Sequence, residues 1–294
     1  MIAIFTSNRN NYLLNFIVVV LPAFFLFISV FSINVYDIFA ASADTTVSVN
    51  GQTIATTGTS VSTHADTNDL SSSVNPACGQ VIQGDIKLVS NLICNGDGLI
   101  VGAKGTKIDL NGFSIIGPGK DSNKVGIMVA GQKNVNILGH GSILGFQSGL
   151  YIAGSNDVRT TNLNLYNNKI AVYITGTSST DIISNMLNNN TIGIASHTNN
   201  QTNIKYNLLN ENVLSGITFI NTADSIINGN NIINSTNGIF LDPQSSLNKV
   251  DFNNVFDNVL DINNANNLPL NINNNSFTNN NCLTSLPSGL CIGR

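Results

Sequence analysis

The tetrapeptide Gly216-Ile217-Thr218-Phe219 is one copy of a motif that recurs along the chain: a small residue, an apolar residue, any residue and a second apolar residue. The first residues of the copies are Gly126, Gly149, Ala171, Gly193, Gly216, Gly238 and, with a looser match, Leu260. Successive copies are therefore 22 or 23 residues apart. A fixed period of this length is typical of a solenoid, in which one repeat cannot bury its apolar face alone and stacks on its neighbours.

Asparagine marks a second register between these copies. The pattern Asn-x-x-Asn, or a close variant of it, begins at Asn164, Asn185, Asn207, Asn231, Asn254 and Asn275. Asparagine at a bend tolerates left-handed backbone angles, and amides stacked on successive coils can hydrogen-bond along the stack. We therefore predict that these asparagines form structural ladders rather than a binding site.

A third column of apolar residues begins a short strand in each repeat. Its members are Val135, Val158, Ile182, Ile204, Ile226 and Val250. Each repeat thus offers short β-type segments separated by turn residues. A leucine-rich repeat would need a Leu-x-x-Leu-x-Leu run, and an α-solenoid would need helical segments without Gly and Asn. The sequence predicts an all-β fold, a single-stranded parallel β-helix with coils of about 22 residues.

Composition narrows the classes of partner. The chain has 294 residues, of which 42% are hydrophobic and only 10% are charged, and its net charge is -4. No basic surface is expected, so nucleic acid is not an expected partner. The low charge suits an outer surface of Asn, Ser and Thr, and the length suits one large domain.

Residues 1–43 are expected to lie outside the folded domain. Arg9 precedes an apolar run from Phe16 to Val30, and the small residues at 41–43 follow, which is the order of a secretory signal peptide. An uncleaved membrane anchor is the alternative, because the apolar stretch is long enough to span a membrane. Residues 44–75 are rich in Ser, Thr, Asn and Asp and are predicted to be a linker. Under either alternative the rest of the chain is secreted or held at the cell surface.

Four cysteines form two local pairs in the predicted β-helix domain, residues 76–294. Cys78 and Cys94 precede the repeats, and Cys282 and Cys291 follow them. In an exported chain an even number of cysteines indicates disulfides, and bonds at both ends would cap the open edges of the stack. A four-thiolate metal site is the alternative, but the spacing contains no Cys-x-x-Cys pair. The first full coil is predicted at residues 98–119.

Three runs carry a resemblance to a known family: CNGDGLIV at residues 94–101, IDLNGFSIIG at 108–117 and NVNILGHGSILGF at 134–146. They resemble the right-handed parallel β-helix repeat proteins of the pectate-lyase-like superfamily, in a noncatalytic or uncharacterised branch, over about residues 76–280. The resemblance implies a right-handed coil. It implies no single activity, because this fold hosts lyases, hydrolases, epimerases, phage spikes and noncatalytic surface proteins.

The repeats are also similar to those of a periplasmic accessory protein of nitrous oxide reductase, which raises the question of a copper role. The chain's histidines, His64, His140 and His197, are far apart in sequence, and Met128 and Met186 are the methionines of the repeat region. These soft and imidazole donors do not cluster. We therefore predict no metal site.

Four charged residues are the first candidates for function. Asp157 and Asp181 precede apolar members of the third column, and Arg159 and Lys205 follow such members, so the four are expected to form one exposed patch on adjacent coils. Enzymes of the resembled superfamily pair Ca²⁺-binding carboxylates with a basic residue that removes a proton from the sugar. If the protein is a lyase, this patch is its catalytic site and Ca²⁺ its cofactor. The alternative is a set of ordinary cross-strand charge pairs.

Tyr151 and Tyr173 are the second candidates, because they lie 22 residues apart at an outward position between two inward apolar residues. Two exposed rings in line are predicted to form a stacking platform for sugar rings. The alternative is a column that another segment covers. His197 and Asp242 share a neighbouring outward column two coils apart, and we expect them to be solvated and too far apart to pair.

These observations favour a secreted or surface-anchored β-helix that is a noncatalytic carbohydrate-associated, structural or adhesive module. Its expected partner is a polysaccharide or cell-envelope glycan, and no cofactor is expected. The alternative is a polysaccharide lyase or glycoside hydrolase that acts on an acidic polysaccharide at the patch of four charged residues. Contact with a membrane is expected only through the N-terminal segment.

Overall fold

The computed structural model describes residues 13–20, 27–34 and 75–292, which belong to two units, Met1–Asp66 and Thr67–Arg294. In the first unit, β1 (Leu13–Val20) and β2 (Phe27–Asn34) pair as an antiparallel hairpin. Most of the expected signal peptide or anchor, and nearly all of the linker at 44–75, lie outside the described residues, and both stay predictions. Within the described parts of the chain, no helix has the length and hydropathy needed to cross a bilayer.

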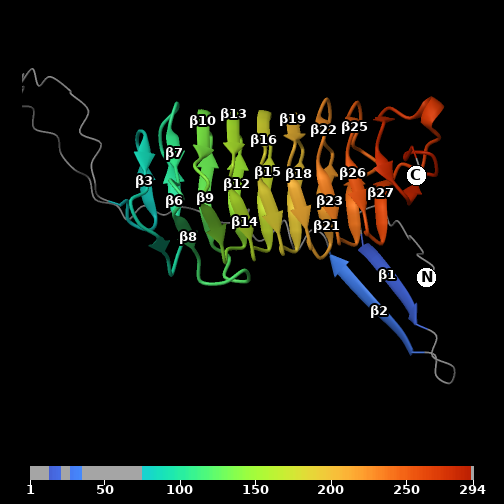
Figure 1. The fold of residues 1–294 in the computed structure, drawn as a ribbon, viewed down its shortest axis with the longest axis horizontal. Helices are drawn as coiled ribbons and strands as arrows, with labels where there is room; N and C mark the ends of the chain where they lie inside the picture. Colours follow the sequence, from blue (N-terminus) through green and yellow to red (C-terminus); the bar gives the residue numbers. More distant parts are fainter. Residues whose placement is uncertain (1–12, 21–26, 35–74, 293–294) are drawn as a thin grey trace, which may run out of the picture. The chain divides into compact units, whose positions relative to one another are not determined.

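The second unit contains three sheets, and each coil contributes one strand to each sheet (Figure 1). The first sheet consists of β3 (Gln80–Ile82), β6 (Leu99–Val101), β9 (Val125–Ala130), β12 (Ser148–Ala153), β15 (Ile170–Thr175), β18 (Ile192–His197), β21 (Ser215–Ile220), β24 (Asn237–Leu241), β27 (Leu260–Asn264) and β30 (Ser285–Leu286). The second sheet consists of β4 (Ile86–Lys87), β7 (Lys107–Asp109), β10 (Lys133–Leu138), β13 (Asn156–Thr161), β16 (Ser178–Ile183), β19 (Asn200–Lys205), β22 (Ile226–Asn228), β25 (Lys249–Asp251) and β28 (Ser276–Thr278). The third sheet consists of β5 (Leu92–Ile93), β8 (Ser114–Ile116), β11 (Ser142–Leu144), β14 (Asn164–Tyr166), β17 (Met186–Asn188), β20 (Leu208–Asn210), β23 (Asn231–Ile233), β26 (Asn254–Phe256) and β29 (Asn281–Cys282). A short 3-10 helix, η1 (Leu270–Ile272), follows β27.

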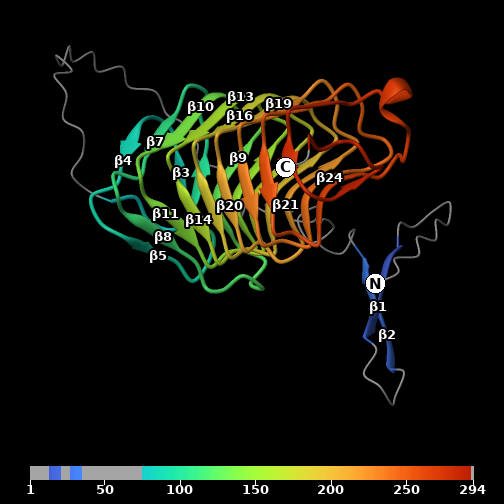
Figure 2. The same cartoon turned by 45° about the vertical axis from the view of Figure 1, so that its right-hand side comes forward.

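Strands of one sheet pair in parallel, and each pairs with the strand one coil before and one coil after it. The architecture is therefore the right-handed parallel β-helix that the sequence and the resemblance predict. Figure 1 shows the coils side by side from β3 to β27, and Figure 2, turned toward the end of the stack, shows the faces that enclose the core. The first coil runs from β3 to β5, so the prediction of a first coil at 98–119 is wrong by one coil.

The core is a stack of aliphatic side chains that point inward from all three sheets. In the first sheet, one inward column in register is fully buried and consists of Leu99, Ile127, Leu150, Val172, Ile194, Ile217, Ile239 and Ile262. The first position of each repeat copy holds a small residue for a steric reason. A Cβ added to Gly216 would lie 2.4 Å from Ile232 Cγ2 and 2.8 Å from the Gly238 carbonyl oxygen. A larger side chain there would push neighbouring coils apart.

One predicted column is wrong in its register. Val158 pairs with Thr180, whereas Ile182 pairs with Thr160 on one side and with Ile204 on the other. The predicted column therefore joined two inward positions that lie two residues apart along the strand, and it also included the outward-facing Ile226 where the inward residue is Ile227. The physical reason is that Thr160 and Thr180, both fully buried, occupy places that aliphatic residues hold in other coils.

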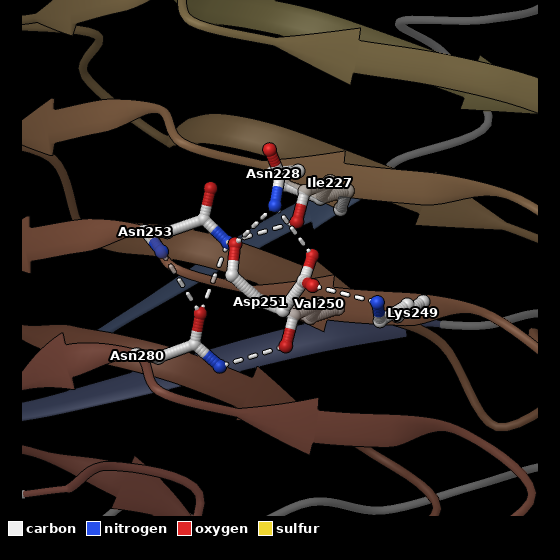
Figure 3. Close-up of polar contacts among 7 residues, drawn as sticks. All are labelled: Ile227, Asn228, Lys249, Val250, Asp251, Asn253 and Asn280. Carbon is white, nitrogen blue, oxygen red and sulfur yellow. Dashed lines mark hydrogen bonds and ion pairs between the residues drawn. The ribbon is translucent and has the colours of Figure 1, made fainter.

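An asparagine ladder runs along the corner between the second and third sheets. Its members are buried and consist of Asn185, Asn207, Asn230, Asn253 and Asn280. The Asn207 Oδ1 accepts a hydrogen bond from the backbone N–H of Asn185 at 2.8 Å, and its Nδ2 donates to the Ile182 carbonyl at 2.8 Å. Figure 3 shows the same pattern further along, where the Asn280 Nδ2 donates to the Val250 carbonyl. The ladder thus satisfies backbone groups that the turn leaves without a strand partner.

A second ladder, formed by Asn168, Asn190 and Asn212, lies at the corner between the third and first sheets. The predicted structural role of asparagine is confirmed, but part of the predicted membership is wrong. Asn231 and Asn254 begin strands β23 and β26 and are exposed. The ladder position instead follows a corner residue of positive φ, a feature that the Asn-x-x-Asn pattern does not locate.

Both predicted disulfides are present, Cys78–Cys94 and Cys282–Cys291. The first closes a loop that contains the whole first coil, and the second ties β29 to the residues after β30. Cys94 and Cys282 are buried against the two ends of the apolar core. The bonds therefore hold the end coils, whose strands form the sheet edges.

We expect Asn207→Ala to lower the free energy of unfolding by about 2–4 kcal/mol, because it leaves the N–H of Asn185 and the carbonyl of Ile182 buried without these partners. Denaturant unfolding followed by circular dichroism measures the loss. Asn231→Ala is the matched control, since this side chain is exposed, and its effect should stay within about 0.5 kcal/mol. Equal losses in the two variants would contradict a stabilising ladder.

Candidate functional site

The two predicted stacking residues lie side by side on the outer face of the first sheet. Tyr151 in β12 is in register with Tyr173 in β15, and their ring centroids are 5.6 Å apart with the planes tilted by 44°. Tyr151 is half-buried, but Tyr173 is only 4% exposed, so the prediction of two exposed rings is wrong for Tyr173. Burial raises the pKa of Tyr173 to about 12; the Thr175 hydrogen bond lowers it and the nearby Tyr151 raises it. Tyr173 thus supports the ring of Tyr151, which is the accessible member.

Asp242 is buried, contrary to the prediction that both His197 and Asp242 are solvated, and the prediction that the two are too far apart to pair directly stays a prediction. His197 ends β18, and Asp242 follows β24 and is 9% exposed. Burial lowers the pKa of His197, and the Asp242 carboxylate raises it. Burial also raises the pKa of Asp242, against hydrogen bonds from the Ser245 hydroxyl at 2.7 Å and the Asn221 N–H at 3.0 Å. The sequence pattern missed the burial of Asp242 because it places backbones in coils and not side chains.

The charged residues share the outer face of the second sheet, but not in the predicted columns. Arg159 is in register with Asp181, whose Oδ1 accepts a hydrogen bond from Asn203 Nδ2 at 2.9 Å. Lys205 lies on the same face, two residues beyond Asn203. Asp157 precedes Val158, which pairs with Thr180, so Asp157 does not lie in the column of Asp181. The backbone of Asp157 has a positive φ of 55°. Arg159, Asp181, Asn203 and Lys205 therefore form a charged patch, and its catalytic role stays a prediction.

Polar residues that the sequence analysis did not single out extend this patch along the stack (Figure 3). Lys205 is in register with Asn228, and Asn228 with Asp251. The Asp251 carboxylate accepts from Asn228 Nδ2 at 2.8 Å and pairs with Lys249 Nζ at 2.8 Å. The sequence signal for this ion pair was Lys249-x-Asp251, because residues two apart lie on one face of a strand. Placing the pair beside Asn228 and Lys205 required the correct register of the second sheet.

The pKa shift of His197 makes the stability of the protein pH-dependent. Since the folded pKa lies below the ordinary value of 6.5, the unfolded chain binds this proton more tightly, and stability falls as the pH drops through 6.5 toward the folded pKa. The raised pKa of Asp242 acts in a lower window, where stability falls as the pH rises above 3.8.

We therefore expect the thermal midpoint to fall between about pH 7.5 and about pH 5.5, on either side of the ordinary histidine pKa, and His197→Gln to reduce that fall. Calorimetric scans of both proteins across this range measure it. His140→Gln is the control, because His140 lies at a corner of another sheet. A fall that is unchanged in His197→Gln would contradict this assignment.

The chain is similar to one protein family and to several solved structures. Residues 104–286 match the family model described as periplasmic copper-binding protein (NosD), and no curated protein matches the sequence. Solved structures similar to this chain include DFA-IIIase from Arthrobacter chlorophenolicus, with 16% identity over 67% of this chain and 53% of that one and a TM-score of 0.47. A second is the enzymatically active domain of bacteriophage CBA120 tailspike protein 2, with 16% identity over 69% of this chain and 37% of that one and a TM-score of 0.45. A third is the Thermotoga maritima exopolygalacturonase, with 9% identity over 72% of this chain and 69% of that one and a TM-score of 0.36. The chain spans about half the length of the first of these, and at such identities the likeness concerns the fold alone.

A copper site needs several imidazole or sulfur donors that converge on one point. In the described part of the chain, no three His, Cys, Asp or Glu side chains form such a group, and all four cysteines are in disulfides. Met128 and Met186 lie on different sheets. The described residues therefore do not fit a copper site, and no chemistry of this chain is derived through copper. The matched residues nevertheless make up more than half of the 294-residue chain, and the chain belongs to the NosD family of periplasmic proteins.

Proposed function

We propose that this NosD-family chain is an extracytoplasmic β-helix module that binds a glycan without cleaving it. The observation that carries the proposal is the half-buried ring of Tyr151, packed 5.6 Å from the ring of Tyr173. An aromatic side chain offers a sugar ring an apolar face, and a ring held in place by its neighbour loses little freedom on binding. The periplasmic family and the two disulfides support a location outside the cytoplasm.

The surroundings of Tyr151 favour a flat ligand. Met128 is its neighbour in the same outward column, and the next outward column carries the small side chains of Ala130 and Ala153. An apolar floor without bulky neighbours leaves room for a sugar ring to lie against Tyr151. A glycan that follows the stack would meet equivalent positions at every coil, about 4.8 Å apart.

A polysaccharide lyase or glycoside hydrolase is the second candidate, and a specific contact favours it. Arg159 lies in register with Asp181, and Lys205 is on the same face, so a base and a carboxylate stand close to each other. Asp157 stands apart from Asp181 and does not complete a pair of carboxylates in one column. Ca²⁺ would have to bind Asp181 with few other protein oxygens, which is a weak arrangement for this ion.

The test uses the disulfide-bonded chain with immobilised cellulose, xylan, chitin, alginate and pectin, with and without Ca²⁺. We expect retention on at least one polymer and no shorter products by size-exclusion chromatography. Tyr151→Ala should weaken retention about tenfold, as the loss of a central aromatic contact does. Tyr166→Ala is the matched control, because Tyr166 is also half-buried but lies on the third sheet.

Two results would overturn the proposal. The first is equal retention of the native chain and Tyr151→Ala, which would remove the tyrosine from the site. The second is product formation that disappears in Arg159→Ala, which would identify the charged patch as a catalytic site.

A further inference from the structure

Two aromatic side chains on the corner between the second and third sheets are both exposed and held in an unfavourable backbone conformation. Tyr206 has a φ of 57° and is 63% exposed, and Phe252 has a φ of 55° and is 59% exposed. Large side chains are disfavoured at positive φ, and large apolar side chains are disfavoured in water. Other coils place Asn, Ser or Gly at this corner, for example Asn162, Ser184 and Gly229. Leu247 shares both unfavourable features at another corner, so what distinguishes Tyr206 and Phe252 is that both are aromatic and lie at the same corner.

Gly229 separates the two rings. The backbone N–H of Tyr206 donates to the Asn228 carbonyl at 3.1 Å, and that of Gly229 donates to the Asp251 carbonyl at 3.2 Å, so Tyr206, Gly229 and Phe252 stack in one column. A Cβ added to Gly229 would lie 2.7 Å from both Cδ1 and Cε1 of the Tyr206 ring. The Tyr206 ring therefore lies over Gly229, in the space that a side chain at this position would need. We call these three residues the aromatic corner.

Amide side chains flank the aromatic corner on both sides. Asn228 lies on the second sheet directly before Gly229 (Figure 3), and Asn231 begins β23 on the third sheet and is exposed. An apolar surface with a few polar groups at its edge is the usual composition of a site for a ligand that has both apolar faces and hydroxyl groups.

We propose that the aromatic corner is a glycan-binding site, in which Tyr206 and Phe252 stack on sugar rings of an extended chain that runs along the stack. The backbone positions of Tyr206 and Phe252 are two coils, about 9.6 Å, apart, and the Tyr206 ring lies over the coil between them. The exposed amide of Asn231 is placed to bond sugar hydroxyls, whereas the Nδ2 of Asn228 already donates to Asp251. This inference rests on the proposed function, glycan binding, and assigns it a second site on another face.

A protein partner is the competing occupant, and the composition disfavours it. The aromatic corner offers two rings separated by a glycine and flanked by amides, whereas a specific protein interface needs a continuous surface of about 800 Å² on each partner. Lys205 directly precedes Tyr206 and Asp251 directly precedes Phe252, and because these charges have opposite signs they favour a neutral polymer over an acidic one.

The experiment measures retention of the full chain and three variants on cellulose, xylan and chitin, together with their thermal midpoints. Tyr206→Asn and Phe252→Asn should each weaken retention about tenfold or more. Both should also raise the midpoint, because asparagine accepts positive φ more readily than an aromatic residue. Leu247→Asn is the matched control: Leu247 has a φ of 58° and is 62% exposed but lies on another corner. This variant should raise the midpoint and leave retention unchanged.

Distinct outcomes separate this site from Tyr151. Weaker binding in Tyr206→Asn and Phe252→Asn, with Leu247→Asn unchanged, supports the aromatic corner whatever Tyr151→Ala does. Loss in Tyr151→Ala alone would keep the proposed function and overturn the aromatic corner. Retention lost equally in Leu247→Asn, or a lower midpoint in Tyr206→Asn, would show a general or structural effect and would also overturn it. No retention of the native chain on any polymer would overturn both proposals.

Discussion

The fold depends on one constraint: every coil lies a single strand spacing, about 4.8 Å, from the next, so each corner must satisfy its backbone polar groups within the stack. Asparagine meets this requirement because one amide both accepts and donates. Asn207 accepts the N–H of Asn185 in the preceding coil and donates to the Ile182 carbonyl of the strand before that corner. A ladder of such residues ties each coil to its neighbour through side chains as well as through strands. One added residue at a corner would move the amide away from its partners, so the length of the corner is fixed although the coils differ in length.

The same constraint explains which residues the corners accept. A tight corner needs a residue of positive φ before the ladder asparagine, and most of the non-glycine residues found there are Asn, Asp or Ser. The exceptions are Thr198, Tyr206, Glu211, Leu247 and Phe252. An L-residue in this region is less stable by about 1–2 kcal/mol. The stack tolerates this because ladders and core fix the backbone on both sides of each corner. A rigid framework can therefore present a bulky ring on a corner that would not form by itself.

Much of the architecture could be predicted from the sequence. The repeat period, the parallel coils, the role of asparagine and both disulfides follow from spacing, because these features recur at fixed intervals. The register of the second sheet could not be predicted from the spacing of aliphatic residues, because the polar residue Thr180 occupies an inward position. That shift separated Asp157 from Asp181 and hid the link from Lys205 to Asn228 and Asp251. The burial of Tyr173 could not be predicted from the sequence either, because outward residues in one column have equivalent backbone positions but differ in solvent exposure.

Family membership and site therefore provide different information about this chain. The NosD match covers the repeats, whose inward residues form the core and the ladders. The described residues that face outward are free to vary from coil to coil. In a solenoid a change on one outer column alters only its near neighbours, so a ligand site can arise on any face without disturbing the others. The sulfur donors Met128 and Met186 lie on different sheets, and their placement does not affect the core. The same holds for aromatic residues placed two coils apart. The strain at Tyr206 and Phe252 is informative for this reason, because neither the core nor the ladder requires an aromatic residue at that corner.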